Sequence, residues 1–138
     1  MQADMVVFAG DCSAEVLALD EPLSFWGGLD PQTGLIIDER HPQKGQSVAG
    51  RVLLMPGTRG STSAAGALCE SLRLGMGPAA IVLPEPDALI LAAVTIAAEL
   101  YDRVTPVLAV DMAHWPELTR CKMLHIDTGG NVSEMREA

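Results

Sequence analysis

The chain has 138 residues, a formal net charge of −9, and aromatic residues at only 4% of the sequence. The length suits one domain with a hydrophobic core, so we expect residues 1–138 to form a single domain. The acidic balance argues against nucleic acid or anionic membranes as partners, and the few aromatic residues offer little surface for stacking single-stranded bases.

The first third of the chain consists of short apolar segments separated by turns. Residues 5–10 and 15–19 have the composition and length of strands, and their nearness in the chain favours an antiparallel pair. Residues 35–37 predict another short strand. The polar, turn-rich segment 38–45 contains His41, which we expect to be solvated rather than functional.

Residues 23–38 combine two large aromatic residues with several glycines and a proline, which suits neither a helix nor a strand. Such a loop must be held by its own side chains, so we expect Phe25 or Trp26 to enter the core. The other interpretation is that Gly27 and Gly28 let the backbone approach a ligand or a partner closely.

From residue 51 onward, strands and helices alternate. Early strands followed by β-α-β-α-β alternation predict an α/β domain whose helices flank a central sheet or small barrel. Residues 79–83 are an unbroken apolar run, expected to be buried on both faces of a parallel or mixed sheet, and the polar tail 131–138 is expected to fray. The segments are strands at 51–55, 79–83, 105–110 and 121–127, helices at 62–74 and 86–101, and a loop or short helical turn at 113–118.

The predicted helix over 86–101 is unusual because residues 88–94 are apolar nearly all round. A helix with this pattern is either fully buried or covers a partner. Full burial is difficult in a domain of this size, which favours a protein–protein surface and allows the isolated chain to self-associate.

A glycine-rich turn over residues 55–66 joins the strand at 51–55 to the helix at 62–74. Backbone N–H groups and the positive dipole end at a helix start favour an anion, and Arg59 adds a planar cation suited to a carboxylate or phosphate. The hydroxyls of Ser61, Thr62 and Ser63 either cap the helix or contribute to an anion or catalytic site.

Two familiar motifs do not fit this turn. A nucleophile elbow needs a glycine two residues on each side of the serine, and a P-loop ends in Gly-Lys-Ser/Thr; neither occurs. The remaining interpretation is that Ser61 acts as a base or anion ligand. A helix dipole contributes at most about 2 kcal/mol, which lowers a hydroxyl pKa by little more than about one unit, so another polypeptide would have to complete the site.

Three widely separated cysteines, Cys12, Cys69 and Cys121, form no CxxC pair and no cysteine–histidine cluster with metal-site spacing. We interpret each as a small buried hydrophobic residue, and we expect no metal site in this chain. The odd number favours reduced thiols, and the N-terminus lacks a basic signal-peptide region, so we expect a cytoplasmic protein.

Five blocks, spread over essentially the whole chain, together resemble the aconitase X swivel-domain family. The resemblance implies a swivelling β/β/α fold, like the mobile domain of aconitase, in a small subunit that pairs with a larger catalytic subunit. It also implies an iron or iron–sulfur centre in that larger subunit. The blocks are Glu21-Pro22-Leu23-Ser24-Phe25-Trp26-Gly27-Gly28-Leu29-Asp30-Pro31, Thr33-Gly34-Leu35-Ile36-Ile37-Asp38, His41-Pro42, Val48-Ala49-Gly50-Arg51-Val52-Leu53 and Arg59-Gly60-Ser61-Thr62-Ser63.

The resemblance further implies a hydro-lyase that dehydrates a small hydroxy acid. We expect cis-3-hydroxy-L-proline as substrate, with mevalonate 5-phosphate as the alternative. Ser61 corresponds to the proton acceptor of the family. The residues expected to bind substrate, or in the first loop to line the site or the subunit contact, are Arg59, Gly60, Thr62, Ser63, Ser24, Trp26, Gly27 and Gly28.

Two other functions are weighed against this one. A mobile phosphocarrier domain would need a histidine in the glycine-rich turn, but His41, His114 and His125 all lie outside it. A regulatory or binding subunit without chemistry of its own is the other alternative.

Overall fold

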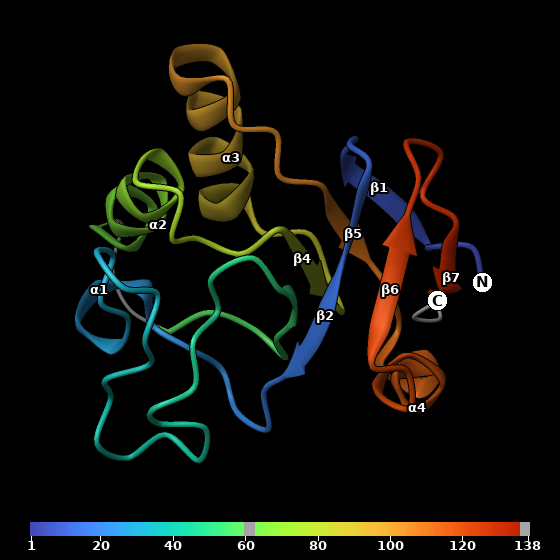
Figure 1. Cartoon of the computed structure of the whole chain (residues 1–138), viewed down its shortest axis with the longest axis horizontal. Helices are drawn as coiled ribbons and strands as arrows, with labels where there is room; N and C mark the ends of the chain where they lie inside the picture. The colour runs from blue at the N-terminus through green and yellow to red at the C-terminus, as the bar shows by residue number, and fades with distance from the viewer. Residues whose placement is uncertain (60–62, 136–138) are drawn as a thin grey trace.

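The computed structural model describes residues 1–59 and 63–135. The strands of the described chain form one sheet in the order β1-β5-β4-β3-β2-β6-β7, which curls into a half-barrel flanked by helices (Figure 1). This confirms the predicted α/β class. The strands are β1 (Met5–Phe8), β2 (Cys12–Ala18), β3 (Val52–Leu54), β4 (Ala80–Leu83), β5 (Val107–Ala109), β6 (Met123–Ile126) and β7 (Val132–Glu134); the helices are α1 (Phe25–Gly28), α2 (Ser63–Arg73), α3 (Ala88–Tyr101), the 3₁₀ turn η1 (Met112–His114) and α4 (Trp115–Thr119).

Four parallel strands, β2, β3, β4 and β5, form the centre of the sheet. Every residue of β3, β4 and β5 is buried, as the apolar run at 79–83 predicts. Successive side chains point to opposite faces, so Leu53 joins one core cluster while Val52 and Leu54 join the other.

The two faces of the sheet are covered differently. Helices α1, α2 and α3 lie on one side, and the curled end of the sheet with α4 lies on the other (Figure 1). Leu68 and Leu72 of α2 and Ile90 and Val94 of α3 fill the first cluster. Trp115 of α4 enters the second cluster, where its indole N–H donates to the carbonyl of Val110 at 2.9 Å.

The predicted antiparallel pair of the first two strands is wrong. β1 pairs with β5 and so covers what would otherwise be the open edge of β5. β2 is long enough to pair twice: Cys12–Glu15 with β6, and Val16–Ala18 with β3.

The described part of the tail, residues 131–135, differs from the prediction. Val132–Glu134 forms β7, antiparallel to β6, and Val132 is buried. The turn before it is closed by Asp127, whose carboxylate accepts hydrogen bonds from the N–H groups of Gly129 and Asn131 at 3.0 and 2.9 Å. A tight Asx-type turn therefore stabilises a strand that polarity alone did not suggest.

Two smaller predictions also change. Residues 35–37 make only isolated bridges, Leu29 to Ile36 and Leu35 to Ser47, and Ile36 alone of the three is buried. All three cysteines are partly buried rather than fully buried.

Helix α3 is neither fully buried nor fully exposed. Asp87 caps its first turn, and the face that carries Ile90 and Val94 packs into the core. Outside that face, Leu91, Ile96 and Leu100 remain in contact with solvent. Full burial is thus excluded for this helix, as predicted from the small size of the domain. Among the described helices, none is long and apolar enough to cross a bilayer.

Candidate functional site

The segment 55–59 lies at the carboxyl end of β3, where the chain leaves the sheet towards α2. Its main chain is tied to the first loop: the N–H of Leu23 donates to the carbonyl of Gly57 at 3.3 Å, and the N–H of Arg59 donates to the carbonyl of Leu23 at 3.2 Å. These bonds form a short parallel bridge between Leu23 and Thr58. Two regions that the sequence singled out separately are therefore adjacent.

A second tie runs to α3, which follows β4. The Thr58 hydroxyl donates to Oδ2 of Asp87 at 2.8 Å. The other oxygen of Asp87 accepts the N–H groups of Leu89 and Ile90, at 2.9 and 3.0 Å, and so caps α3. The carboxyl ends of β3 and β4 are thus linked at the edge where open α/β sheets bind ligands.

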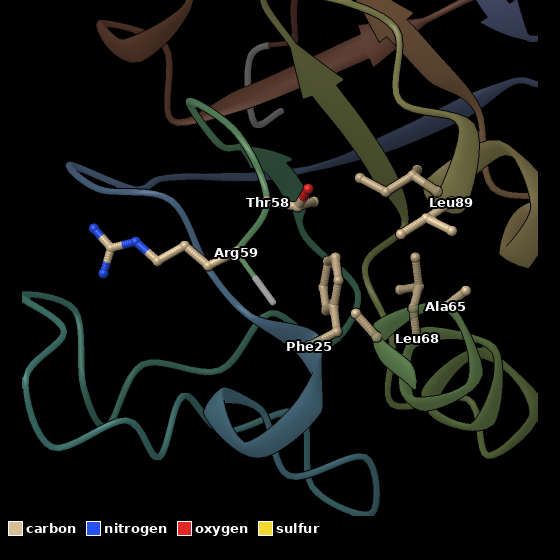
Figure 2. Close-up of a pocket in the computed structure, with 8 residues that line it drawn as sticks. Phe25, Thr58, Arg59, Ala65, Leu68 and Leu89 are labelled. Atoms are coloured by element: carbon tan, nitrogen blue, oxygen red, sulfur yellow. The ribbon is translucent and has the colours of Figure 1, made fainter. Parts of the chain in front are cut away.

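Arg59 makes an ion pair that its sequence position did not reveal. One guanidinium nitrogen lies 3.1 Å from Oε1 of Glu21, and both side chains are about half exposed. Figure 2 shows the side chain extending away from Phe25, Ala65 and Leu68. The charged group of Arg59 therefore lies at the surface, not inside the pocket that its backbone borders.

That pocket is small and mostly apolar. It holds about 10 Å³, room for about one water molecule, which is far too little for a hydroxy acid. Phe25 is fully buried at its base, as predicted for one of the two loop aromatics. The lining residues are Phe25, Thr58, Arg59, Ala64, Ala65, Leu68, Leu89 and Ile90.

A larger groove lies on the other side of Phe25, between the first loop and α2. Its volume of about 500 Å³ is in the range of small-molecule sites, but it is open and largely apolar. It contains three of the predicted residues, Trp26, Gly27 and Ser63. Trp26 is 65% exposed, in contrast to its buried neighbour Phe25.

The first loop has its own local order. Ser24 donates to the carbonyl of Trp26 at 2.7 Å, and Gly27 has a φ of 81°, which a residue with a side chain rarely adopts. Gly28 accepts the N–H of Ile37 at 2.9 Å. A Cβ at Gly27 would meet nothing within 4 Å, so conformation, rather than close approach within this chain, explains that glycine.

The predicted site residues therefore divide into four groups. Trp26, Gly27 and Ser63 line the groove, while Arg59 lies at the surface on the far side of Phe25. Ser24 and Gly28 hold the loop in shape. Gly60, Ser61 and Thr62 lie outside the described residues, so the assignment of Ser61 as proton acceptor stays a prediction.

Two charged groups border these surfaces. At the groove, Glu70 accepts hydrogen bonds from the guanidinium of Arg73, one of them at 2.9 Å from Nε, and this hydrogen bonding lowers the pKa of the Glu70 carboxyl. Glu21, on the other side of Phe25, pairs with Arg59. Neither acid was predicted as part of the site, and no local sequence signal marks Glu21, because its partner is 38 residues away.

His41 differs from its prediction, because its side chain is buried instead of solvated. Its ring nitrogens contact the carbonyl of Glu21 at 3.2 Å and the N–H of Gln43 at 3.1 Å. His41 therefore holds the loop over residues 38–45 against the segment that carries Glu21.

Across residues 1–59 and 63–135, no group of three or more histidine, cysteine or acidic side chains is arranged to hold a metal ion.

Comparisons with known proteins match almost the whole chain. The family model for the aconitase X swivel domain matches residues 1–134. The crystal structure of Thermococcus kodakaraensis aconitase X in its holo-form is similar with a TM-score of 0.77 and 27% identity, over 95% of each chain.

Two curated relatives are similar in sequence. The cis-3-hydroxy-L-proline dehydratase of Hypocrea jecorina is 35% identical over 127 residues, which is 92% of this chain and 21% of that protein. The phosphomevalonate dehydratase small subunit of Methanothermobacter thermautotrophicus is 41% identical over 85 residues, 62% of this chain and 65% of that subunit. The chain thus spans about a fifth of the first relative and under two thirds of the second.

Proposed function

The chain belongs to the aconitase X swivel-domain family, and on that premise we propose that it is the small subunit of a two-subunit hydro-lyase. The match of the family model over residues 1–134 carries the proposal. The fold adds support, because Arg59 and the start of α3 lie at the carboxyl ends of adjacent parallel strands, β3 and β4. The partner is a larger aconitase X subunit, and both would act in the cytoplasm, which cell fractionation would test.

The proposed reaction removes water from a small hydroxy acid. Ser61 accepts the proton alpha to the substrate carboxylate, and the electron pair of that C–H bond forms the new double bond as the C–O bond breaks. The departing hydroxide takes up a proton from solvent and leaves as water, and Ser61 returns its proton to solvent. Arg59 holds an anionic group of the substrate through charge-assisted hydrogen bonds. The dipole of α2 supplies only part of the pKa change that Ser61 needs, so the larger subunit has to complete the site.

An iron or iron–sulfur centre is part of the same proposal. The described residues offer no donor set that fits it, so we place the centre in the larger subunit. This chain then contributes the base, the anion contact and the loop that carries Trp26. The groove of about 500 Å³ that Trp26 and Ser63 line supports this division, because it is open and a second subunit could close it.

The preferred substrate is cis-3-hydroxy-L-proline. The dehydratase of that name aligns over 92% of this chain, whereas the phosphomevalonate dehydratase small subunit aligns over 62%. Mevalonate 5-phosphate remains the second candidate, because the phosphomevalonate dehydratase small subunit is 41% identical over its alignment.

Co-expression with a large aconitase X subunit from the same genome tests the proposal. The purified complex is assayed for water loss from each of the two acids, beside each subunit alone. We expect turnover of cis-3-hydroxy-L-proline only when both subunits are present, loss of that turnover in Ser61→Ala, and normal turnover in Ser133→Ala, which alters an exposed serine of β7. Full activity of Ser61→Ala would contradict the assignment of the base.

A non-catalytic binding subunit is the alternative that the exposure of Trp26 favours, since an exposed tryptophan is typical of a binding hot spot. It predicts that the larger subunit is active alone and that this chain changes only its stability or regulation. The same assay separates the two functions.

A further inference from the structure

We propose that Thr58 is a positioning residue for Arg59 and that it acts through Asp87. The proposal rests on the proposed function, in which Arg59 holds an anionic group of the substrate. Thr58 does not itself touch substrate. It fixes the backbone from which Arg59 extends.

The carboxylate of Asp87 uses its two oxygens for different purposes. Oδ1 accepts the N–H groups of Leu89 and Ile90 in the first turn of α3, whereas Oδ2 accepts the hydroxyl of Thr58, at 2.8 Å. Capping α3 would require only the first oxygen. The second oxygen connects the segment before Arg59 to a helix whose Ile90 and Val94 are fully buried.

Arg59 has few other means of being held in place. Its side chain is 51% exposed, so packing does not fix it, and its ion pair with Glu21 is at the surface. The two main-chain bonds to Leu23 are long, at 3.2 and 3.3 Å. Figure 2 shows Arg59 extending to one side while Leu89, in the first turn of α3, lies on the other side of Thr58. The Thr58 hydrogen bond, at 2.8 Å to a charged acceptor, is thus the shortest of these described ties between the segment that carries Arg59 and the core.

A displaced anion contact affects catalysis more than it affects folding. A misplacement of about 1 Å in a group that orients substrate can cost about 100-fold in rate. For Thr58→Val, which keeps the side-chain shape and removes the hydroxyl, we expect kcat/KM of the complex to fall by about 10-fold, mainly through KM. Thr58→Ser restores the hydroxyl and should recover most of the loss.

Thr95→Val is the matched control, because Thr95 donates to the carbonyl of Leu91 on the exposed face of the same helix. It should leave kcat/KM unchanged. Asp87→Ser keeps a capping oxygen but cannot also reach Thr58, so it should resemble Thr58→Val. The double variant should lose no more activity than either single variant, since both remove one interaction. Fully multiplicative losses would overturn the proposal, as would a normal KM in Thr58→Val.

Amide hydrogen exchange in the isolated chain distinguishes this proposal from the proposed function. Thr58→Val should speed exchange of the Arg59 and Leu23 amides, with exchange in β4 unchanged. If the complex dehydrates neither acid, the proposed function fails, and the exchange result still decides whether Thr58 holds this segment. Unchanged protection of the Arg59 amide would overturn the positioning role in either case.

Discussion

The guanidinium of Arg59 and the carboxylate of Glu21 form a surface ion pair at 3.1 Å, although 38 residues separate them in the chain. The cation assigned to the substrate is therefore already paired with an acid of the same chain. In the proposed complex, the substrate anion must either share the guanidinium of Arg59 with Glu21 or displace Glu21 from it. Mutation can therefore distinguish the two roles, because Arg59 binds the substrate anion whereas Glu21 competes with that anion for the guanidinium.

Arg59→Gln should raise KM for the hydroxy acid by about 10- to 100-fold, because a hydrogen bond to a charged group contributes about 1.5–3 kcal/mol. Arg59→Lys should recover only part of this, since lysine lacks the planar fork. Steady-state kinetics of the reconstituted complex measures the effect. An unchanged KM in Arg59→Gln would show that Arg59 does not bind the substrate.

Glu21→Gln should lower KM or leave it unchanged, because it frees Arg59 without removing the cation. Its effect on the free energy of unfolding should stay below about 1 kcal/mol, as for other exposed ion pairs. Denaturant unfolding of the isolated chain measures the second effect. A rise in KM comparable to that of Arg59→Gln would mean that Glu21 orients Arg59 instead of competing for it.

Phe25→Ala and Trp26→Ala should behave in opposite ways, although the residues are adjacent. Phe25 is 1% exposed in the core, so its truncation should cost about 3–5 kcal/mol of unfolding free energy. Trp26 is 65% exposed, so Trp26→Ala should leave the isolated chain stable and weaken its association with the larger subunit. Thermal unfolding measures the stability of each variant, and titration calorimetry measures its affinity for the larger subunit. Normal affinity of Trp26→Ala would place the subunit contact elsewhere.

Gly27→Ala should destabilise the chain by about 1–2 kcal/mol, because an alanine at a φ of 81° is strained. Gly28→Ala is the control, since its φ is not positive and its new Cβ would approach Leu23 only to 3.4 Å, an ordinary contact. Chemical denaturation of both variants measures the difference. Equal stability would show that the loop relaxes around Gly27.

The thiol of Cys12 should react slowly with alkylating reagents. Burial, with a smaller contribution from Asp11, raises its pKa to about 11. The thiolate is the reactive form, so at pH 8.5 folded Cys12 should alkylate well below the rate of the same residue in unfolded protein, and the rate should rise as the pH approaches 11. Mass spectrometry of peptides after timed labelling measures this. Equal rates in folded and unfolded protein would contradict the burial of this thiol.

The outer face of α3 should mediate association of the isolated chain. Ile96 and Leu100 are 45% and 68% exposed, so Ile96→Glu and Leu100→Lys should cost little stability. If copies pair through this face, both variants should shift the chain towards monomer in analytical ultracentrifugation. A wild-type chain that is monomeric at high concentration would show that copies do not associate through this face, which could then bind only another partner.

Several features followed from the sequence because they depend on local pattern. The apolar run at 79–83 predicts a strand buried on both faces, and β4 lies there, fully buried between β3 and β5. The Pro-Asp step before the apolar segment predicts the start of α3, where Asp87 caps the helix. The specific order of the aromatic–glycine block and the Arg-Gly-Ser block was sufficient to identify the family.

Other features depend on contacts between distant segments, which no local pattern encodes. Whether β1 pairs with β2 or β5 is decided by which sheet edge would otherwise stay open, and the burial of His41 depends on a carbonyl 20 residues earlier. The link from Thr58 to Asp87 and the ion pair of Arg59 with Glu21 join residues 29 and 38 positions apart. The sequence by itself thus determined the elements, the family and the candidate residues. Only the tertiary structure decided which of them meet, because packing the helices against the curled sheet sets those distances.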